Sequence, residues 1–206
     1  MNFLKNINLG KHGIWILFTL LVGLLSCNRA ATERVILRTQ LGDITLEIAT
    51  GKAPVTAANF LSLVEQGVYE GAVFYRVVRP DNQPNSPVKI EVIQGGLFDD
   101  KLIDSYPPID HETTDFTGIQ HTDGVISMAR MEPGSASTEI FICVGDQPSL
   151  DYGGDRNPDG AGFAAFGWVT EGMDVVRDIQ ALPDSGQYLI KKVLIDSIYI
   201  PCLPVH

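Results

Sequence analysis

The stretch V-I-L-R-T-Q-L-G-D-I-T-L-E-I, residues 35–48, is the clearest structural signal in this 206-residue chain. Apolar and polar side chains alternate on both sides of a turn at 41–43. Because a period of two residues gives a β-strand one apolar face, the stretch predicts a β-hairpin with one buried face. The positions that form this face are Val35, Leu37, Thr39, Ile44, Leu46 and Ile48.

Further strand patterns follow the hairpin, with glycine and proline in the connections between them. Two helices are predicted as well. Thr56 looks like the N-cap of a helix that Gly67 stops, and a second helix runs from Met173 to Leu182 and ends at Pro183. The expected strands cover residues 72–78, 89–94, 125–128, 140–144, 164–169 and 191–200.

This set of elements predicts the fold class. Many short strands with two helices are typical of a mainly β domain, in which a closed antiparallel barrel carries helices over its ends. Periodicity alone does not separate such a barrel from a sandwich of two sheets. The chain from residue 27 onward has 180 residues, which is enough for one domain with a substantial core.

Six regions of the sequence, taken in order, resemble one family. They are F-Y-R-V-V (74–78), V-I-Q-G-G (92–96), G-V-I-S-M-A-R (124–130) followed by T-E-I-F-I-C-V (138–144), L-D (150–151), F-A-A-F-G (163–167) and E-G-M-D-V-V (171–176). Together they resemble the cyclophilins, a family of peptidyl-prolyl cis–trans isomerases. The resemblance covers about residues 35–202. It implies a closed eight-stranded antiparallel β-barrel that accelerates isomerisation of X–Pro bonds.

The chemistry of this reaction suits Arg76. An X–Pro bond is planar because the nitrogen shares its lone pair with the carbonyl, and rotation costs about 18–20 kcal/mol. At the twisted transition state the lone pair returns to nitrogen, so a guanidinium donor aimed at it binds the transition state better than the ground state. Arginine stays charged and presents its donors in a fixed fork. In the resemblance, Arg76 is the catalytic arginine, and no nucleophile, metal or cofactor is needed.

The resemblance also implies the rest of the site. Gln94 matches the catalytic-site glutamine that hydrogen-bonds the substrate near the proline. An apolar wall is implied around the proline ring, beside a strand whose backbone pairs with the residues before the proline. The implied substrate-binding residues are Val92, Phe141 and Leu150 in the wall, Ala129 and Arg130 in the strand, and Phe163 at a position where many members carry histidine.

The chain departs from the family pattern between Arg76 and Gln94. This stretch is about ten residues longer than usual, and its loop at 79–90 is expected to lie at the groove. Glu91 falls where the family carries a phenylalanine of the proline pocket; there it would pair with Arg76 and lower activity. The other departures are Arg130 for asparagine, Glu139 for glutamine and Ser149 for tryptophan.

Two other functions remain open. In the first, the same barrel holds proline-containing segments as a chaperone or scaffold with little turnover, which Glu91 and the long loop favour. Intact Arg76 and Gln94 favour the enzyme instead. The second is a sugar-binding barrel, which is less favoured because Trp15 and Trp168 are the only tryptophans and few aromatic platforms would be available.

The first 26 residues have the pattern of a secretory signal. Lysines precede an apolar run of 12 residues, Ile14 to Leu25, whereas a membrane span needs about 20. Cys27 follows Leu24-Leu25-Ser26, which resembles the lipobox of bacterial lipoproteins. That resemblance implies a cut before Cys27 and a diacylglycerol lipid on its thiol. An ordinary signal peptide with a chance cysteine, or an uncleaved anchor, remains the alternative.

These signals predict the organisation of the chain. The lipid on Cys27 would hold a domain on a membrane of the bacterial cell envelope, outside the cytoplasm. The predicted parts are a lipoprotein signal peptide at 1–26, a short tether at 27–34 and the cyclophilin-like domain at 35–206.

The charge of the chain bears on its partners. The formal charge is −10, and residues 1–26 carry two lysines and no acids, so the remainder carries −12. An acidic domain without a basic stripe is a poor binder of nucleic acid. A calcium-like pattern that begins at Asp155 has Phe166 where a glutamate ligand is required, so no metal is expected. We expect a monomer that binds proline-containing polypeptides and reaches the membrane only through its lipid.

Two of the remaining polar groups have structural interpretations. Cys143 ends an apolar strand and is predicted to be buried core. The family topology puts it near Cys202, so a disulfide between them remains open. His121 precedes the strand at 125–128 and is predicted to be a structural hydrogen-bonding residue.

Overall fold

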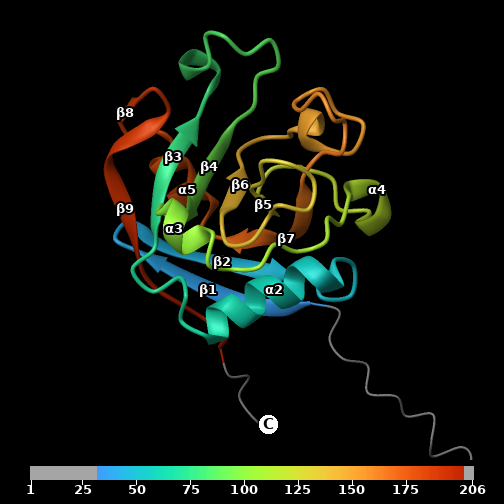
Figure 1. Ribbon diagram of the computed structural model, residues 1–206. Coiled ribbons are helices and arrows are strands. Elements are labelled where there is room, and N and C mark those ends of the chain that lie inside the picture. Colours follow the sequence, from blue (N-terminus) through green and yellow to red (C-terminus); the bar gives the residue numbers. More distant parts are fainter. Residues whose placement is uncertain (1–31, 202–206) are drawn as a thin grey trace, which may run out of the picture.

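The computed structural model describes residues 32–201 and contains the expected barrel (Figure 1). Eight antiparallel strands follow one another in the order β1-β2-β7-β5-β6-β4-β3-β9, and pairing of β1 with β9 closes the sheet. The two-residue β8 only pairs antiparallel with the start of β9. The bounds are β1 Glu33–Thr39, β2 Gly42–Ile48, β3 Val73–Val78, β4 Val92–Gly96, β5 Val125–Met128, β6 Ile140–Cys143, β7 Ala164–Glu171, β8 Asp184–Ser185 and β9 Tyr188–Tyr199.

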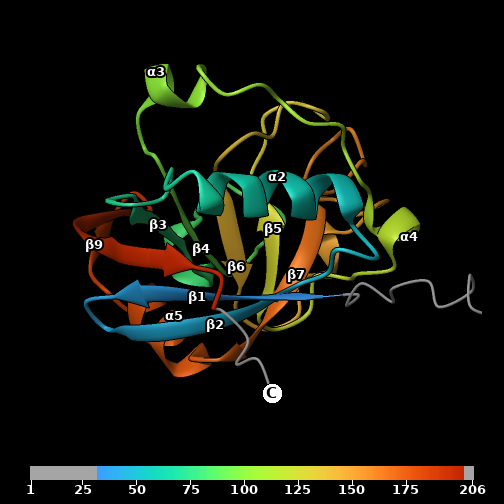
Figure 2. The same cartoon turned by 90° about the horizontal axis from the view of Figure 1, so that it is seen from below.

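Two longer helices pack on the barrel, as predicted (Figures 1 and 2). Helix α2, Pro54–Glu65, lies against β7 and β9, and helix α5, Met173–Gln180, lies against β2, β3 and β4. The remaining helices are one-turn pieces: α3 Asp100–Ile103, α4 Thr114–Thr117, and 3₁₀ turns at Pro80–Asn82 and Pro148–Leu150. Within residues 32–201, no helix combines the length and apolarity needed to cross a membrane.

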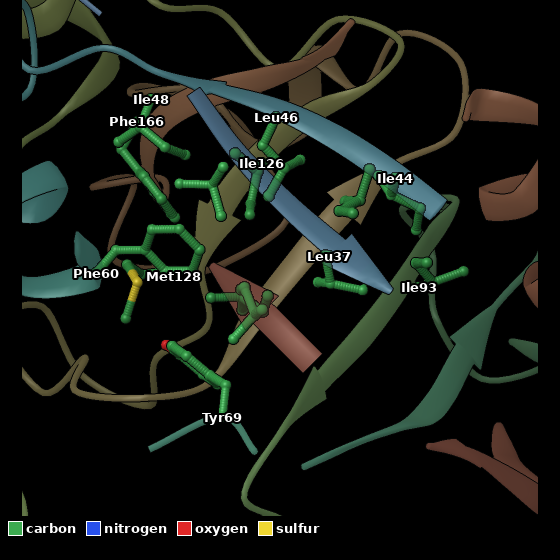
Figure 3. Packing of buried hydrophobic residues seen from close by; sticks show 14 of the residues in the cluster. Leu37, Ile44, Leu46, Ile48, Phe60, Tyr69, Ile93, Ile126, Met128 and Phe166 are labelled. Carbon is green, nitrogen blue, oxygen red and sulfur yellow. The ribbon is translucent and has the colours of Figure 1, made fainter. Parts of the chain in front are cut away.

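The hairpin at 35–48 has the predicted buried face. All six of its expected positions are buried, and Thr39, at 7 % exposed, is the most accessible of them. The five aliphatic residues among them join one core that fills the barrel under α2 (Figure 3). Phe60 of α2 enters this core, with ring-centroid distances of 5.5 Å to Tyr69 and 5.1 Å to Phe166. The barrel interior is therefore packed with side chains, and any site must lie on its outside.

The start of α2 differs from the expectation. Thr56 is not the N-cap, because the helix begins at Pro54 after Ala53. The Glu112 carboxylate caps it instead, accepting the N–H groups of Val55 at 3.2 Å and Thr56 at 2.7 Å and the Thr56 hydroxyl at 2.7 Å. The sequence near the helix could not reveal a cap that lies 56 residues away.

Some strand bounds differ as well. The strand expected at 89–94 is β4, which begins only at Val92, because both backbone groups of Ile90 bond the Gln83 side chain rather than a neighbouring strand. The last strand begins at Tyr188, three residues before its predicted start. At the start of the domain, β1 includes Glu33 and Arg34, which the sequence assigns to the tether. Strand β8 and helices α3 and α4 were not predicted, since two to four residues show no periodicity.

The predictions for residues 1–31 and for Cys202 lie outside the described residues.

Candidate active site

Strand β3 presents Arg76 on the outside of the barrel. Arg76 lies opposite Gln94 in β4 and opposite Tyr188 in β9. The register of both pairings shifts between Phe74 and Arg76. Against β4, Tyr75 is an extra residue on β3, whereas against β9 the extra residues lie on β9. Phe74 belongs to the barrel core, and its two successors do not. The irregularity thus gives the outer face two adjacent polar side chains from one strand.

Two amide oxygens hold the Arg76 guanidinium. Gln94 Oε1 accepts from Nη1 at 2.8 Å, and Gln187 Oε1 accepts from Nε at 3.0 Å and from Nη2 at 2.6 Å. Burial lowers the pKa of Arg76, while Tyr188 and Tyr75 oppose that shift. Because the ordinary pKa of arginine lies far above neutrality, the group stays a cation.

A chain of hydrogen bonds runs from this cation to a buried acid. Gln94 Nε2 donates to the Tyr75 hydroxyl at 2.7 Å, and that hydroxyl donates to Glu139 Oε2 at 2.7 Å. The other Glu139 oxygen accepts the Leu97 N–H at 2.7 Å. Burial raises the pKa of Glu139, and its hydrogen bonds offset part of that shift. The chain fixes the Gln94 amide with its oxygen toward Arg76.

The apolar wall forms a second cluster, separate from the barrel core. Val92, Phe141 and Leu150 belong to it, together with Val78, Ile90 and Cys143, and Ala129 and Phe163 pack against it. Phe163 stands edge-on to Phe141 at a centroid distance of 5.3 Å. Phe141, Val92 and Leu150 are only 5 %, 3 % and 1 % exposed, so the wall is nearly covered in this conformation.

Arg130 is held by Asp159 and by the ring of Phe163. Its guanidinium makes two bonds of 2.9 Å to the Asp159 carboxylate and lies 5.0 Å from the centre of the Phe163 ring. The Arg130 side chain holds the pKa of Asp159 below its ordinary range. A cavity of about 450 Å³ opens beside it, lined by Gln94, Ala129 and Arg130 among others.

His121 is a structural residue, as predicted. It lies between Asp151 and Ser127, with Nδ1 at 2.8 Å from Asp151 Oδ1 and Nε2 at 3.0 Å from Ser127 Oγ. The order acid–histidine–serine is that of a hydrolase triad, but His121 and Ser127 are 1 % and 0 % exposed. No substrate reaches that hydroxyl. The His121 ring instead stacks on Phe141 at 5.8 Å and supports the wall.

The structure brings together Arg76, Gln94 and the wall, and it corrects other expectations. Among the ion pairs of residues 32–201, none joins Glu91 to Arg76. Cys143 is buried as predicted, and its thiol forms no disulfide with another residue of 32–201.

Sequence reasoning did not identify Gln187 as a site residue. It lies 111 residues from Arg76, in a turn whose composition alone indicates no role. Tyr75 was part of a matched block, but its position between Gln94 and Glu139 required the fold.

Comparisons with known proteins agree with this geometry. Residues 34–200 match the family described as cyclophilin type peptidyl-prolyl cis-trans isomerase/CLD. A peptidyl-prolyl cis-trans isomerase of Acinetobacter baylyi is 36 % identical over 165 residues, which are 79 % of each chain. Peptidyl-prolyl cis-trans isomerase B of Escherichia coli is 34 % identical over 151 residues, which are 72 % of this chain and 84 % of that one.

Solved structures share the fold. The crystal structure of a cyclophilin-type isomerase from Cryptosporidium parvum superposes with a TM-score of 0.66 at 21 % identity, covering 84 % of this chain and 99 % of that one. The same protein in the presence of the dipeptide Ala-Pro superposes with a TM-score of 0.65. The match over residues 34–200 and the bacterial relatives together show that the chain belongs to the cyclophilin-type peptidyl-prolyl cis-trans isomerase family.

Proposed function

We propose that this protein accelerates cis–trans isomerisation of X–Pro bonds in polypeptides outside the cytoplasm, while a lipid on Cys27 holds it on a membrane. The observation that carries the catalytic part is the Arg76 guanidinium, fixed by two neutral amide oxygens beside an apolar wall. Isomerisation without help takes roughly tens to hundreds of seconds, so newly exported chains are suitable substrates.

The side-chain oxygens of Gln94 and Gln187 accept hydrogen bonds from three of the five N–H donors of Arg76. The other two remain to reach the proline nitrogen, whose lone pair becomes an acceptor only as the amide twists. This interaction is stronger in the transition state than in the ground state, which is the requirement for catalysis. Because the partners of Arg76 are neutral amides, its positive charge is not cancelled at the reacting bond.

The apolar wall desolvates the proline ring. Phe141 and its neighbours are nearly covered in this conformation, so a ring reaches them only after a covering side chain moves. Phe163, edge-on to Phe141, is the group we assign to that movement. The residues before the proline then lie in the 450 Å³ cavity beside Ala129 and Arg130. The related fold solved in the presence of Ala-Pro supports proline-containing peptides as ligands.

The decisive experiment compares the full chain with Arg76→Ala on a proline-containing peptide. We expect kcat/KM to fall about 100-fold or more, since removal of one positioned transition-state donor has effects of that size. Circular dichroism should show the same fold for both, because Arg76 lies outside the barrel core. Equal turnover by two folded proteins would exclude the mechanism.

The alternative is a binding module with little turnover. Glu91 and the long loop favoured it, but the guanidinium contacts amide oxygens and not the Glu91 carboxylate. A folded parent protein that binds the peptide without isomerising it would favour this alternative.

The anchor has its own test. Cys27→Ser removes the thiol that would take the lipid, so we expect the protein to move from the membrane fraction to the soluble fraction of the cell envelope. Cys202→Ser is the matched control and should leave the distribution unchanged. We also propose that the protein is a monomer. Sedimentation of the Cys27→Ser protein measures its mass in solution, and the mass of a dimer would contradict this proposal. Retention of Cys27→Ser on the membrane would exclude the lipid anchor.

A further inference from the structure

The turn between β8 and β9 contains a strained residue next to the site. Its two residues, Gly186 and Gln187, have φ angles of +58° and +76°. Glycine adopts such angles freely, whereas a residue with a Cβ does so at a cost in free energy. A glutamine in the second position is therefore unfavourable for the turn itself, and such an outlier points to a use for its side chain.

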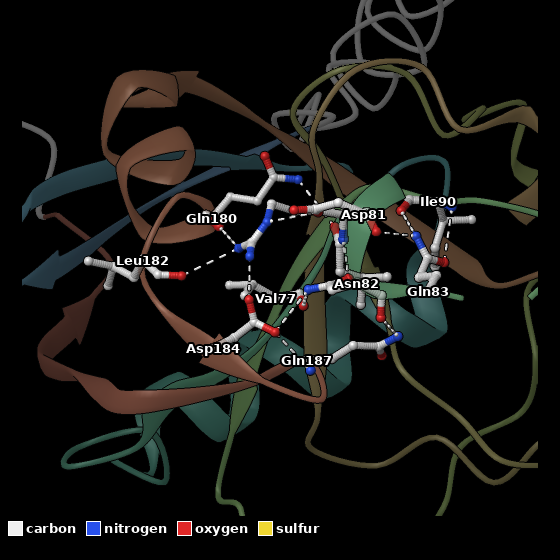
Figure 4. A network of polar contacts seen from close by, with 11 residues as sticks. Val77, Asp81, Asn82, Gln83, Ile90, Gln180, Leu182, Asp184 and Gln187 are labelled. Carbon is white, nitrogen blue, oxygen red and sulfur yellow. Dashed lines mark hydrogen bonds and ion pairs between the residues drawn. The ribbon is translucent and has the colours of Figure 1, made fainter. Parts of the chain in front are cut away.

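The Gln187 side chain lies on the catalytic guanidinium. Its Oε1 accepts from Arg76 Nε at 3.0 Å and from Nη2 at 2.6 Å. Its Nε2 donates to the Asn82 carbonyl at 3.2 Å, which fixes the amide with the oxygen toward Arg76 (Figure 4). The neutral Gln187 oxygen thereby occupies the Nε–Nη2 edge of the guanidinium, and Gln94 Oε1 accepts from Nη1.

The backbone of Gln187 is anchored on both sides. Its N–H donates to Asp184 Oδ2 at 2.9 Å, and its carbonyl accepts the Val77 N–H at 2.8 Å (Figure 4). The Asp184 carboxylate also binds the side chains of Arg79 and Asn82. Burial alone would raise the pKa of Asp184, but these donors hold it below its ordinary range. The turn is thus a rigid support that ends on Arg76.

We propose that Gln187 is a positioning residue, which holds the plane of the Arg76 guanidinium so that its free N–H groups meet the twisted proline nitrogen. This inference rests on the proposed isomerase function. A glutamine suits the task because its oxygen accepts two donors without cancelling the positive charge. An aspartate or glutamate in that place would orient Arg76 equally well but would neutralise it.

The test compares the full-length protein with Gln187→Gly and Gln187→Asn. Glycine removes the side chain and relieves the positive φ, and asparagine tolerates that φ but is one methylene too short to reach Arg76. Both variants should keep a Tm close to that of the parent. We expect kcat to fall roughly 10- to 100-fold, the effect of a small misplacement of a reacting group, with KM nearly unchanged.

Two further measurements make the result specific. The Arg76 Nε–H resonance, followed by ¹⁵N NMR, should exchange faster with water in both variants because its acceptor is gone. Gln40→Gly, a matched change in the exposed turn after β1, should leave both kcat and the resonance unchanged. A parent-like kcat in Gln187→Gly, or losses of Tm and activity with an unchanged resonance, would overturn the proposal. If instead the parent and Arg76→Ala are equally inactive, the isomerase function itself fails.

Discussion

At the scale of single residues, the Arg76 cation and the acids linked to it through hydrogen bonds are kept apart. Arg76 contacts amide oxygens, and Glu139 lies three hydrogen bonds away through Gln94 and Tyr75. The series of hydrogen bonds that orients Gln94 therefore leaves the positive charge of Arg76 without a carboxylate partner. Burial is also the main reason that the pKa of Tyr75 rises, with Glu139 adding to it, so this hydroxyl stays protonated and remains a donor.

The stability of the protein should depend on the charge of Glu139. Its pKa is raised in the folded state, so the native protein binds this proton more tightly than the unfolded chain does. The stabilisation from protonated Glu139 is complete below the pKa that this group has in the unfolded chain. It is lost as the pH rises through the pKa of Glu139 in the folded protein. Glu139→Gln removes this titration. We therefore expect the free energy of unfolding of the variant, relative to the parent, to increase from about pH 4 to pH 7.

Urea unfolding at several pH values measures this difference. Glu132→Gln, a change of an exposed glutamate, is the control and should follow the parent throughout. If the free energies of unfolding of Glu139→Gln and the parent change in parallel with pH, the titration of Glu139 does not affect stability.

At the scale of elements, the long loop at 79–90 is joined to the loop after the 3₁₀ turn at Pro148–Leu150. Arg156 Nη1 donates to Ser86 Oγ and to the Val88 carbonyl, both at 2.7 Å, and to Gln83 Oε1 at 3.2 Å. Burial lowers the pKa of Arg156, and the nearby charge of Arg76 adds to that shift. The residues expected to form an insertion at the groove thus form a structured edge of the site.

Arg156→Ala should loosen this edge without unfolding the barrel. Hydrogen bonds from a charged donor contribute about 1.5–3 kcal/mol each, so protease cleavage within 79–90 should accelerate at least about tenfold. Arg34→Ala is the control, because its 3.6 Å ion pair with Glu171 is exposed and contributes little. Limited proteolysis with mass spectrometry measures both. Equal cleavage rates would mean that the loop is held by its other contacts.

At the scale of the whole molecule, one packed core joins helix α2 to the barrel. Phe60 is fully buried between Tyr69 and Phe166. Truncation of a buried phenylalanine removes its burial and leaves a cavity, so Phe60→Ala should lower the free energy of unfolding by about 3–5 kcal/mol. Phe116→Ala, at a residue 72 % exposed, should change it by less than about 0.5 kcal/mol. Similar losses in both variants, measured by denaturant unfolding, would contradict this description of the core.

Local patterns in the sequence were sufficient for most of the strands, and the resemblance to the cyclophilins implied the closed barrel and half of the site. The alternation at 35–48 predicted a buried hairpin face because a strand repeats every two residues, and the structure has that face. Arg76 and Gln94 were named through the resemblance of short blocks to the cyclophilins, and the structure pairs these two residues on neighbouring strands.

Only the tertiary structure revealed the groups that hold these residues in place. Glu112 caps α2 from 56 residues away, and Gln187 meets Arg76 across 111 residues. Each is a single polar side chain that a loop carries to its partner, and such a side chain has no periodicity and no neighbouring signal in the chain. The sequence by itself therefore determined the strands and, through the family resemblance, the barrel and the arginine proposed to be catalytic. The pairing of β3 with β9, which places the turn with Gln187 beside Arg76, decided how that arginine is oriented.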